Sequence, residues 1–226
     1  QLVELARKAR QISDSLRELG TSLSSTLHFE EVIERIFDGI QEVVPYSTAS
    51  VQLLQNGALR VKGARGISPD HPSWDQGFVV EQYPIVHKMF QTGEPVIVTD
   101  TELEPLWKNT QSGIPIRSWL GVPLRIRNKI IGSLNLDHRQ PNYYTQEHAA
   151  IAATFAQQAA AALENARLFD ETYRRAHQLA ILNELANEMT GLLELEELCT
   201  TVANRLSAAF GYYNVAIFTL DEAANE

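Results

Sequence analysis

The stretch RSWLGVPLRIRNKIIGSLNLDH, residues 117–138, carries apolar side chains at alternate positions on both sides of a short polar break. A period of two is typical of a β-strand with one buried face, and Asn128-Lys129 in the break indicates a turn. The repeating residues are Leu120, Val122, Leu124 and Ile126 before the turn, and Ile130, Leu134 and Leu136 after it. We therefore predict a β-hairpin in this stretch.

The chain before residues 117–138 is predicted to contain an amphipathic helix and another β-hairpin. Residues 28–44 have the apolar spacing of an amphipathic helix, which Pro45 ends. The pair Asn56-Gly57 then separates two alternating runs, and this pair is the one that tight hairpin turns prefer. The alternating apolar residues are Ala49, Val51 and Leu53 before the turn, and Leu59 and Val61 after it.

The chain after the hairpin at 117–138 is predicted to form one long helix. Residues 145–190 contain no Pro or Gly and are rich in Ala, Leu, Glu and Gln, which predicts a helix of about 45 residues. Its first half is expected to cover the sheet with Ile151, Phe155, Ala159, Ala162 and Leu163. Its second half offers another apolar seam, which we expect to project beyond the domain.

Three stretches together resemble a GAF domain: FEEVIERIFDGIQEVV at 29–44, the hairpin at 117–138, and YYTQEHAAIAATFAQQAAAALENARLF at 143–169. The resemblance covers residues 27–169. It implies an α+β fold, with an antiparallel sheet that has helices on one face and a ligand pocket on the other. It also implies a sensory module of a signal-transduction protein, such as a sensor histidine kinase, in which such domains often occur in tandem.

The expected pocket lies between the sheet and residues 66–117, where periodicity weakens apart from a helix at 82–91 and a strand at 95–100. All three tryptophans of the chain lie in or directly after this segment. Aromatic side chains supply contact area, and a guanidinium could pair with an anionic group. The candidate ligand-binding residues are Trp74, Phe78, Trp107, Arg117 and Trp119. Alternatively, these aromatic residues pack a lid onto the sheet without any ligand.

Two known ligands of GAF domains fit the sequence poorly. Domains that bind cyclic nucleotides carry an Asn-Lys, Phe, Asp-Glu pattern, whereas this chain has Asn135-Leu136, Tyr144 and Glu147-His148. Bilin attachment and the cysteine chemistry of GAF-like reductases both need a thiol. The single cysteine of the chain, Cys199, lies at the position equivalent to the core residue Ile33.

No other chemistry is indicated. The six histidines lack metal-ligand spacing, and Asp137-His138 would face opposite sides of a strand, so we predict no metal, no evident cofactor and no catalytic residue. A net charge of −9 without a basic cluster argues against nucleic acid. The sequence offers no apolar run long enough for a membrane span, and a single cysteine fits a reducing compartment, so we expect a cytoplasmic protein.

The beginning of the chain resembles its end. Residues 16–54 align without a gap on 182–220, with Glu30-Glu31 on Glu196-Glu197, and the apolar pattern is kept from helix into strand. Chance similarity between two amphipathic helices is the alternative. We predict an N-terminal signalling helix at 1–26, the GAF domain at 27–169, a connecting helix at 170–193 and a truncated second GAF domain at 194–226.

Two helical seams predict a homodimer. Residues 2–23 carry apolar side chains at alternating spacings of three and four, which is typical of long coiled-coil helices, and residues 163–189 offer a second apolar seam. We further predict that Val215, Ile217 and Leu220 in a strand at 214–220 are covered by a partner. The sequence thus predicts a non-catalytic sensory module that relays ligand binding through dimeric helices; the alternative is a structural dimerisation spacer without a ligand.

Overall fold

A computed structural model describes most of the chain in two compact units, Gln1–Asp170 and Glu171–Glu226, which we treat separately. The N-terminal helix expected over 2–23 lies outside the described residues. The described residues are 26, 28–68, 71, 77–108, 115–189 and 195–218.

The first unit is built on a six-stranded antiparallel sheet with the order β3-β2-β1-β6-β5-β4. The strands are β1 (Thr48–Gln55), β2 (Ala58–Arg65), β3 (Gly77–Val79), β4 (Val96–Val98), β5 (Ser118–Ile126) and β6 (Lys129–His138). The sheet and its helices confirm the predicted α+β fold. Both predicted hairpins are present, as β1–β2 and β5–β6.

The turns of the two hairpins differ in how well the sequence predicts them. Asn56 and Gly57 both have positive φ, at 51° and 81°, as a type I′ turn requires. The turn predicted at Asn128-Lys129 is wrong by one residue, because β6 already begins at Lys129 and the turn consists of Arg127 and Asn128. Arg127 has a φ of 53°, which the sequence pattern did not indicate.

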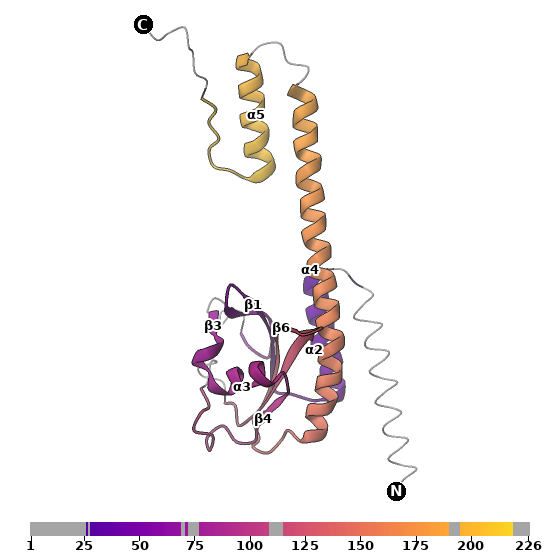
Figure 1. Cartoon of the computed structure of the whole chain (residues 1–226), viewed down its shortest axis with the longest axis vertical. Coiled ribbons are helices and arrows are strands. Elements are labelled where there is room, and N and C mark those ends of the chain that lie inside the picture. The colour runs from indigo at the N-terminus through magenta and orange to yellow at the C-terminus, as the bar shows by residue number, and fades with distance from the viewer. Residues whose placement is uncertain are drawn as a thin grey trace. The chain divides into compact units, whose positions relative to one another are not determined.

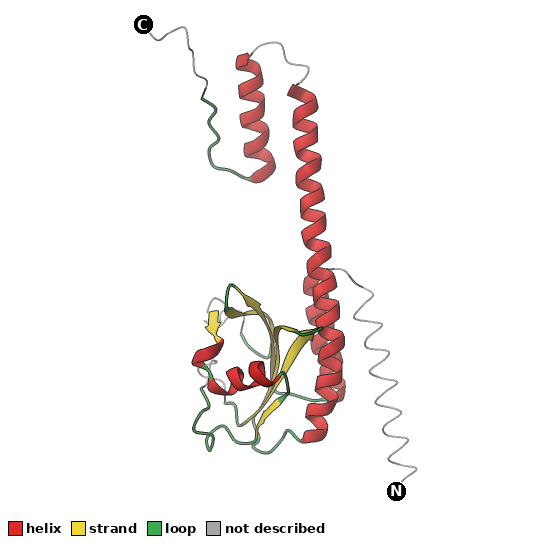
Figure 2. Cartoon of the chain, viewed as in Figure 1, coloured by secondary structure: helices red, strands yellow, loops and turns green. Residues whose placement is uncertain are grey.

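Helices α2 (Phe29–Val43) and α4 (Gln146–Met189) cover one face of the sheet, while the 3-10 helix η2 (Val80–Gln82) and α3 (Pro84–Thr92) cover the other (Figures 1 and 2). The helix predicted at 82–91 therefore corresponds to α3. Helix α4 is a single helix of 44 residues, close to the predicted length. Thr145 and His148 cap its start reciprocally, because each accepts the backbone N–H of the other at 3.3 Å.

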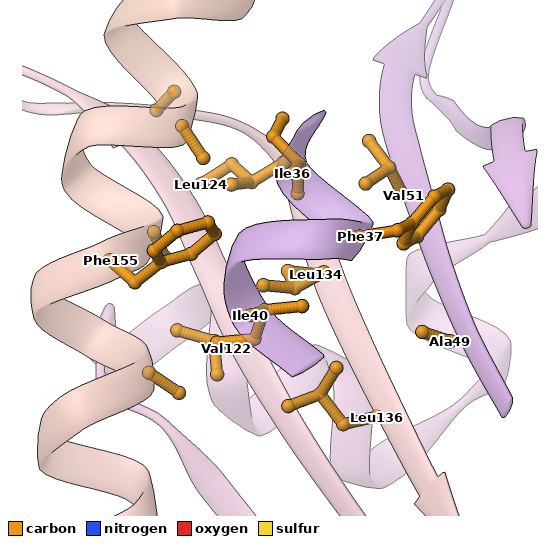
Figure 3. Packing of buried hydrophobic residues seen from close by; sticks show 14 of the residues in the cluster. Ile36, Phe37, Ile40, Ala49, Val51, Val122, Leu124, Leu134, Leu136 and Phe155 are labelled. Carbon is orange, nitrogen blue, oxygen red and sulfur yellow. The ribbon is translucent and has the colours of Figure 1, made fainter. Parts of the chain in front are cut away.

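The main core lies between the sheet and the helices α2 and α4 (Figure 3). Alternate residues of β1, β5 and β6 enter it, as their period of two predicts. Alanines on α4 allow the helix to lie close to its neighbours. At Gly63 the approach of α2 is so close that a Cβ would meet Ile33 Cγ2 at 2.3 Å. Fully buried core residues include Ile36, Phe37, Ile40, Val51, Leu120, Leu134, Leu136 and Phe155.

The second unit contains the last part of α4 and the helix α5 (Leu195–Phe210). The strand expected at 214–220 is absent from its described part, 214–218. A strand needs a neighbour that pairs with its backbone, and the described residues of this unit supply only helices. Ile217 and Phe218 remain 42% and 92% exposed. Leu220 lies outside the described residues, and cover by a partner stays a prediction.

Candidate functional site

The sheet face that turns away from α2 and α4 carries a row of polar side chains on its two central strands. Cross-strand partners share a face, and the register pairs polar residues of β1 with polar residues of β6. The three pairs are Thr48 with Asp137, Ser50 with Asn135, and Gln52 with Ser133. All of these residues except Gln52 are buried. We call these six residues the polar floor.

Side-chain hydrogen bonds connect five of the six residues of the polar floor. The Thr48 hydroxyl donates to Asp137 Oδ2 at 2.8 Å. The carboxamide of Asn135 donates to the hydroxyl oxygens of Ser50 and Ser133 at 3.3 and 3.2 Å. Buried polar groups are costly unless they are bonded, so this network makes a polar surface possible beneath an apolar cover.

Two apolar clusters cover the polar floor. One joins α3 to β4 and β5, and the other joins β2 to β3 and η2. Each contains an aromatic pair: the ring centroids of Trp107 and Trp119 lie 5.5 Å apart, and those of Phe78 and Tyr83 lie 5.8 Å apart with their edges to faces. The cover is therefore aromatic, whereas the floor is polar.

A small cavity lies between the polar floor and the aromatic cover. Ser50, Gln52, Asn135 and Asp137 line it from below, and all four aromatic residues named above line it from the cover. Its volume is about 40 Å³, which leaves room for roughly three water molecules. A bound organic molecule would need the cover to shift outward.

Trp119 reaches the cavity because the sheet has no side chain beneath its ring. A Cβ at Gly121 would lie 2.0 Å from Trp119 Cη2 and 2.4 Å from Cζ2, so the indole folds back over the glycine. Glycine here permits a close approach that any larger residue would prevent.

We expect Gly121→Ala to lower the free energy of unfolding by about 1–3 kcal/mol, because the added methyl group displaces a buried indole. The indole emission should shift toward longer wavelength as Trp119 is pushed toward solvent. The matched control is Gly77→Ala, whose new Cβ would lie 3.4 Å from its nearest neighbour and should cost less than about 0.5 kcal/mol. Chemical denaturation followed by fluorescence measures both variants, and equal effects would contradict the proposed packing.

The structure brings together three of the five candidate residues. Phe78, Trp107 and Trp119 all line the cavity. Trp74 lies outside the described residues. Arg117 is not among the residues that line the cavity, and its guanidinium instead lies against Asp100, with Nη2 at 2.9 Å from Oδ2 and Nε at 3.2 Å from Oδ1.

Arg117 and Asp100 hold the segment that leads to Trp107. The carboxylate of Glu102 lies 3.3 Å from the same guanidinium, and the Thr101 amide donates to the Arg117 carbonyl oxygen at 3.0 Å. The hydrogen bond from Arg117 holds the pKa of Asp100 below its ordinary value. Farther along, Lys108 Nζ donates to the carbonyl oxygen of Gln82 at 2.7 Å, which ties the segment to η2.

The polar floor is the part of the site that sequence reasoning missed. Adjacent residues on a strand face opposite sides, which separates Asp137 from His138. They do differ in their surroundings: Asp137 lines the cavity, whereas His138 stacks on Tyr143 at 3.4 Å between ring centroids. The available signal was the alternation of polar residues in two strands that pair in the centre of the sheet.

Tyr144 is a buried polar residue in the main core. Its side chain is 3% exposed, and its hydroxyl has no hydrogen-bond partner among the described residues. Burial raises the pKa of Tyr144, and the nearby charge of Asp137 raises it further.

We expect Tyr144→Phe to leave the free energy of unfolding unchanged or to raise it by up to about 1 kcal/mol, because the hydroxyl forms no compensating bond. The matched control is Tyr46→Phe, which removes a hydroxyl that donates to the Phe37 carbonyl oxygen at 3.1 Å and should cost about 1 kcal/mol. Urea denaturation of both variants gives the comparison. A loss in Tyr144→Phe as large as that in the control would mean that its hydroxyl is bonded.

No group of three or more His, Cys, Asp or Glu side chains in the described parts of the chain could hold a metal ion. Cys199 lies half-buried in α5, in the second unit. None of the described helices is long and apolar enough to cross a membrane.

Comparison with known proteins agrees with this architecture. The family model described as GAF domain matches residues 26–164, more than half of the chain. Regulatory protein LuxO of Vibrio cholerae serotype O1 is 25% identical over 179 residues, which cover 77% of this chain and 33% of LuxO. The chain thus spans about a third of the length of this relative.

Solved structures match at the level of the fold. The GAF domain from a phosphoenolpyruvate-protein phosphotransferase of Coxiella burnetii matches with a TM-score of 0.63 and 17% identity, over 72% of this chain and 98% of that one. Free methionine-R-sulfoxide reductase from Neisseria meningitidis, solved with its substrate, matches with a TM-score of 0.59 and 16% identity. The match covers 71% of this chain and 93% of the reductase chain. The fold therefore occurs in an enzyme as well as in other proteins. Because a family model matches more than half of the chain, this chain belongs to the GAF domain family.

Proposed function

We propose that this chain is a sensory module without catalytic activity, which binds a small molecule in the cavity and relays the binding through α4. The observation that carries the proposal is the buried polar floor beneath an aromatic cover. A lid that only packs onto a sheet would need no buried carboxylate and carboxamide beneath it. Ligand sites typically combine apolar walls with a few placed polar groups, as this cavity does.

Strand β6 offers a physical route from the cavity to α4. Asn135 and Asp137 line the cavity, whereas Leu134 and Leu136 of the same strand pack in the main core with Phe155 of α4 (Figure 3). A ligand that moves the floor would therefore also move side chains against the helix.

A second connection lies at the end of β6. His138 stacks on Tyr143, and the ring centroid of Tyr143 lies 5.9 Å from that of His148 in the first turn of α4. His148 in turn caps the helix with Thr145. A ligand changes the position of α4 only if it binds one conformation of the domain more tightly than another, and the shift in population is limited by that difference in affinity.

The proposal also includes a domain organisation and a dimer through which the signal would pass. We propose the GAF domain at 27–169, a connecting helix at 170–193 and the start of a second copy at 194–226, in a dimer whose helical contacts lie at 2–23 and 163–189. A regulatory role is supported by the similarity to LuxO, a regulatory protein. A sensor histidine kinase is one form that the whole protein could take.

The proposed absence of catalysis rests on the cysteine. The same fold occurs in a reductase, and GAF-like reductases that use cysteine catalysis need a thiolate. The one cysteine of this chain lies in α5, in the second unit. Phe78, Trp107 and Trp119, together with Trp74, remain our proposed ligand contacts, while Arg117 positions the segment that carries Trp107.

A structural dimerisation spacer is the second candidate, and one observation favours it. The cavity of about 40 Å³ is smaller than the roughly 300–1,000 Å³ of typical ligand pockets. A spacer needs no opening of the cover, whereas a sensor does.

Native mass spectrometry combined with thermal melting separates the two candidates. The sensor predicts a small molecule that stays with the gently purified chain, or a compound in a metabolite collection that raises its melting temperature, as any ligand of the folded state must. Trp107→Ala should reduce either effect. If the chain carries no compound and no compound shifts its melting, the spacer is favoured.

A further inference from the structure

The negative charge that lines the cavity is buried, whereas the positive charge is exposed to solvent. Among the described residues that line it, Asp137 is the only carboxylate and Lys108 the only cation. Asp137 is 3% exposed and lies on the floor. Lys108 is exposed at the edge, where its ammonium group donates to the Gln82 carbonyl oxygen. Water weakens a charge at the edge far more than one on the floor.

The remaining floor groups also favour hydrogen-bond donors. A carboxylate can accept about four hydrogen bonds, and Asp137 accepts one of them from the Thr48 hydroxyl. The carboxamide N–H groups of Asn135 donate to Ser50 and Ser133. The carbonyl oxygen of the Asn135 side chain is therefore the group that can accept a hydrogen bond from a ligand. The guanidinium of Arg117, which could have received an anion, lies against Asp100 instead.

The aromatic cover suits the same class of ligand. The faces of Trp and Tyr rings attract cations and also pack against flat apolar groups. Trp107 and Trp119 lie on one side of the cover, and Phe78 and Tyr83 form the other pair. An anionic group between these rings and Asp137 would be repelled by both the carboxylate and the ring faces.

We propose, on the basis of the sensory function above, that the cavity binds a small molecule with a flat apolar body and a positively charged or strongly hydrogen-bond-donating nitrogen. The nitrogen faces Asp137 and Asn135, and the body lies against Trp107 and Trp119. Anionic molecules of the same shape are rejected.

Two probes of nearly equal shape and opposite charge test the proposal. The full chain, labelled with ¹⁵N, gives one indole N–H signal for each of its three tryptophans, and Trp107→Phe assigns one of them. Benzamidine carries a cationic nitrogen group on a flat ring, whereas benzoate carries a carboxylate. We expect benzamidine to shift the Trp107 signal at concentrations at least about tenfold lower than benzoate, the size of effect that one charge-assisted hydrogen bond supplies.

Asp137→Asn tests the named carboxylate. The variant keeps the shape of the side chain and an oxygen that can accept from Thr48, so the fold should persist, which circular dichroism checks. The preference for benzamidine should fall to less than about threefold. Asp38→Asn makes the same change at an exposed position of α2, where Asp38 pairs with Arg65, and should leave the preference unchanged.

The outcomes distinguish this proposal from the function on which it rests. If benzoate binds as well as benzamidine at the Trp107 signal, the ligand class is wrong and the sensory cavity stands. If the preference survives in Asp137→Asn, the assignment to Asp137 is wrong. If neither probe moves the Trp107 signal at any soluble concentration, both the ligand class and the binding function of the cavity are wrong.

Discussion

Leu134→Ala should lower the free energy of unfolding by about 3–5 kcal/mol. Leu134 is fully buried between the sheet and the two helices that cover it. The substitution removes apolar contacts and leaves a void that close-packed neighbours fill only in part. Because native domains are stable by only about 5–15 kcal/mol, a loss of this size should be visible in simple thermal melting.

The control for Leu134 uses the same chemical change at an exposed site. Leu103 is 78% exposed, and Leu103→Ala should change the free energy of unfolding by less than about 0.5 kcal/mol. Guanidinium denaturation followed by far-ultraviolet circular dichroism compares the two variants. Similar midpoints for both would mean that β6 does not pack against the helices, and the proposed route from the cavity to α4 would be lost.

Replacing both Leu179 and Leu182 with Lys should convert the proposed dimer into a monomer and halve the mass in solution. These residues are 61% and 48% exposed on α4, whereas Ile181 and Leu185 beside them line a groove shared with α5. Exposed apolar seams of this kind are typical of helices that pair, and two ammonium groups in each seam would oppose pairing. Among the side chains of α4 that the structure describes, the other large exposed apolar ones are Leu168, Phe169 and Tyr173.

Multi-angle light scattering of the full chain measures the effect. The matched control places the same two charges at Gln178 and Asn183, which are polar and exposed on the same stretch of α4. The control should keep the mass of two chains. A wild-type chain that already elutes with the mass of one would rule out the dimer, and with it the relay through paired helices.

The fold was predictable because its elements carry strong local patterns. The period of two in β1, β5 and β6 and the Asn56-Gly57 turn defined both hairpins. The absence of Pro and Gly over 145–190 predicted α4. Each of these patterns depends on residues close together in the sequence, so it can be recognised without knowledge of the tertiary structure.

The site was harder to predict because it depends on register. Phe78, Trp107 and Trp119 were found by composition, yet the polar floor requires the knowledge that Ser50 faces Asn135 and that Thr48 faces Asp137. Arg117 was expected in the cavity because of its charge alone. Its position depends instead on Asp100, a residue that neighbours it only after folding.

Hydrogen–deuterium exchange in the presence of a bound probe tests the central claim most directly. With saturating benzamidine, or benzoate if the titration favours it, β6 and the first turns of α4, residues 146–166, should exchange more slowly than in the free chain. Asp137→Asn, at the same benzamidine concentration, should show a smaller change in both elements. Protection confined to the cavity strands and the aromatic cover, with α4 unchanged, would contradict the account, because the ligand would then bind without any effect on the helix that is proposed to carry the signal.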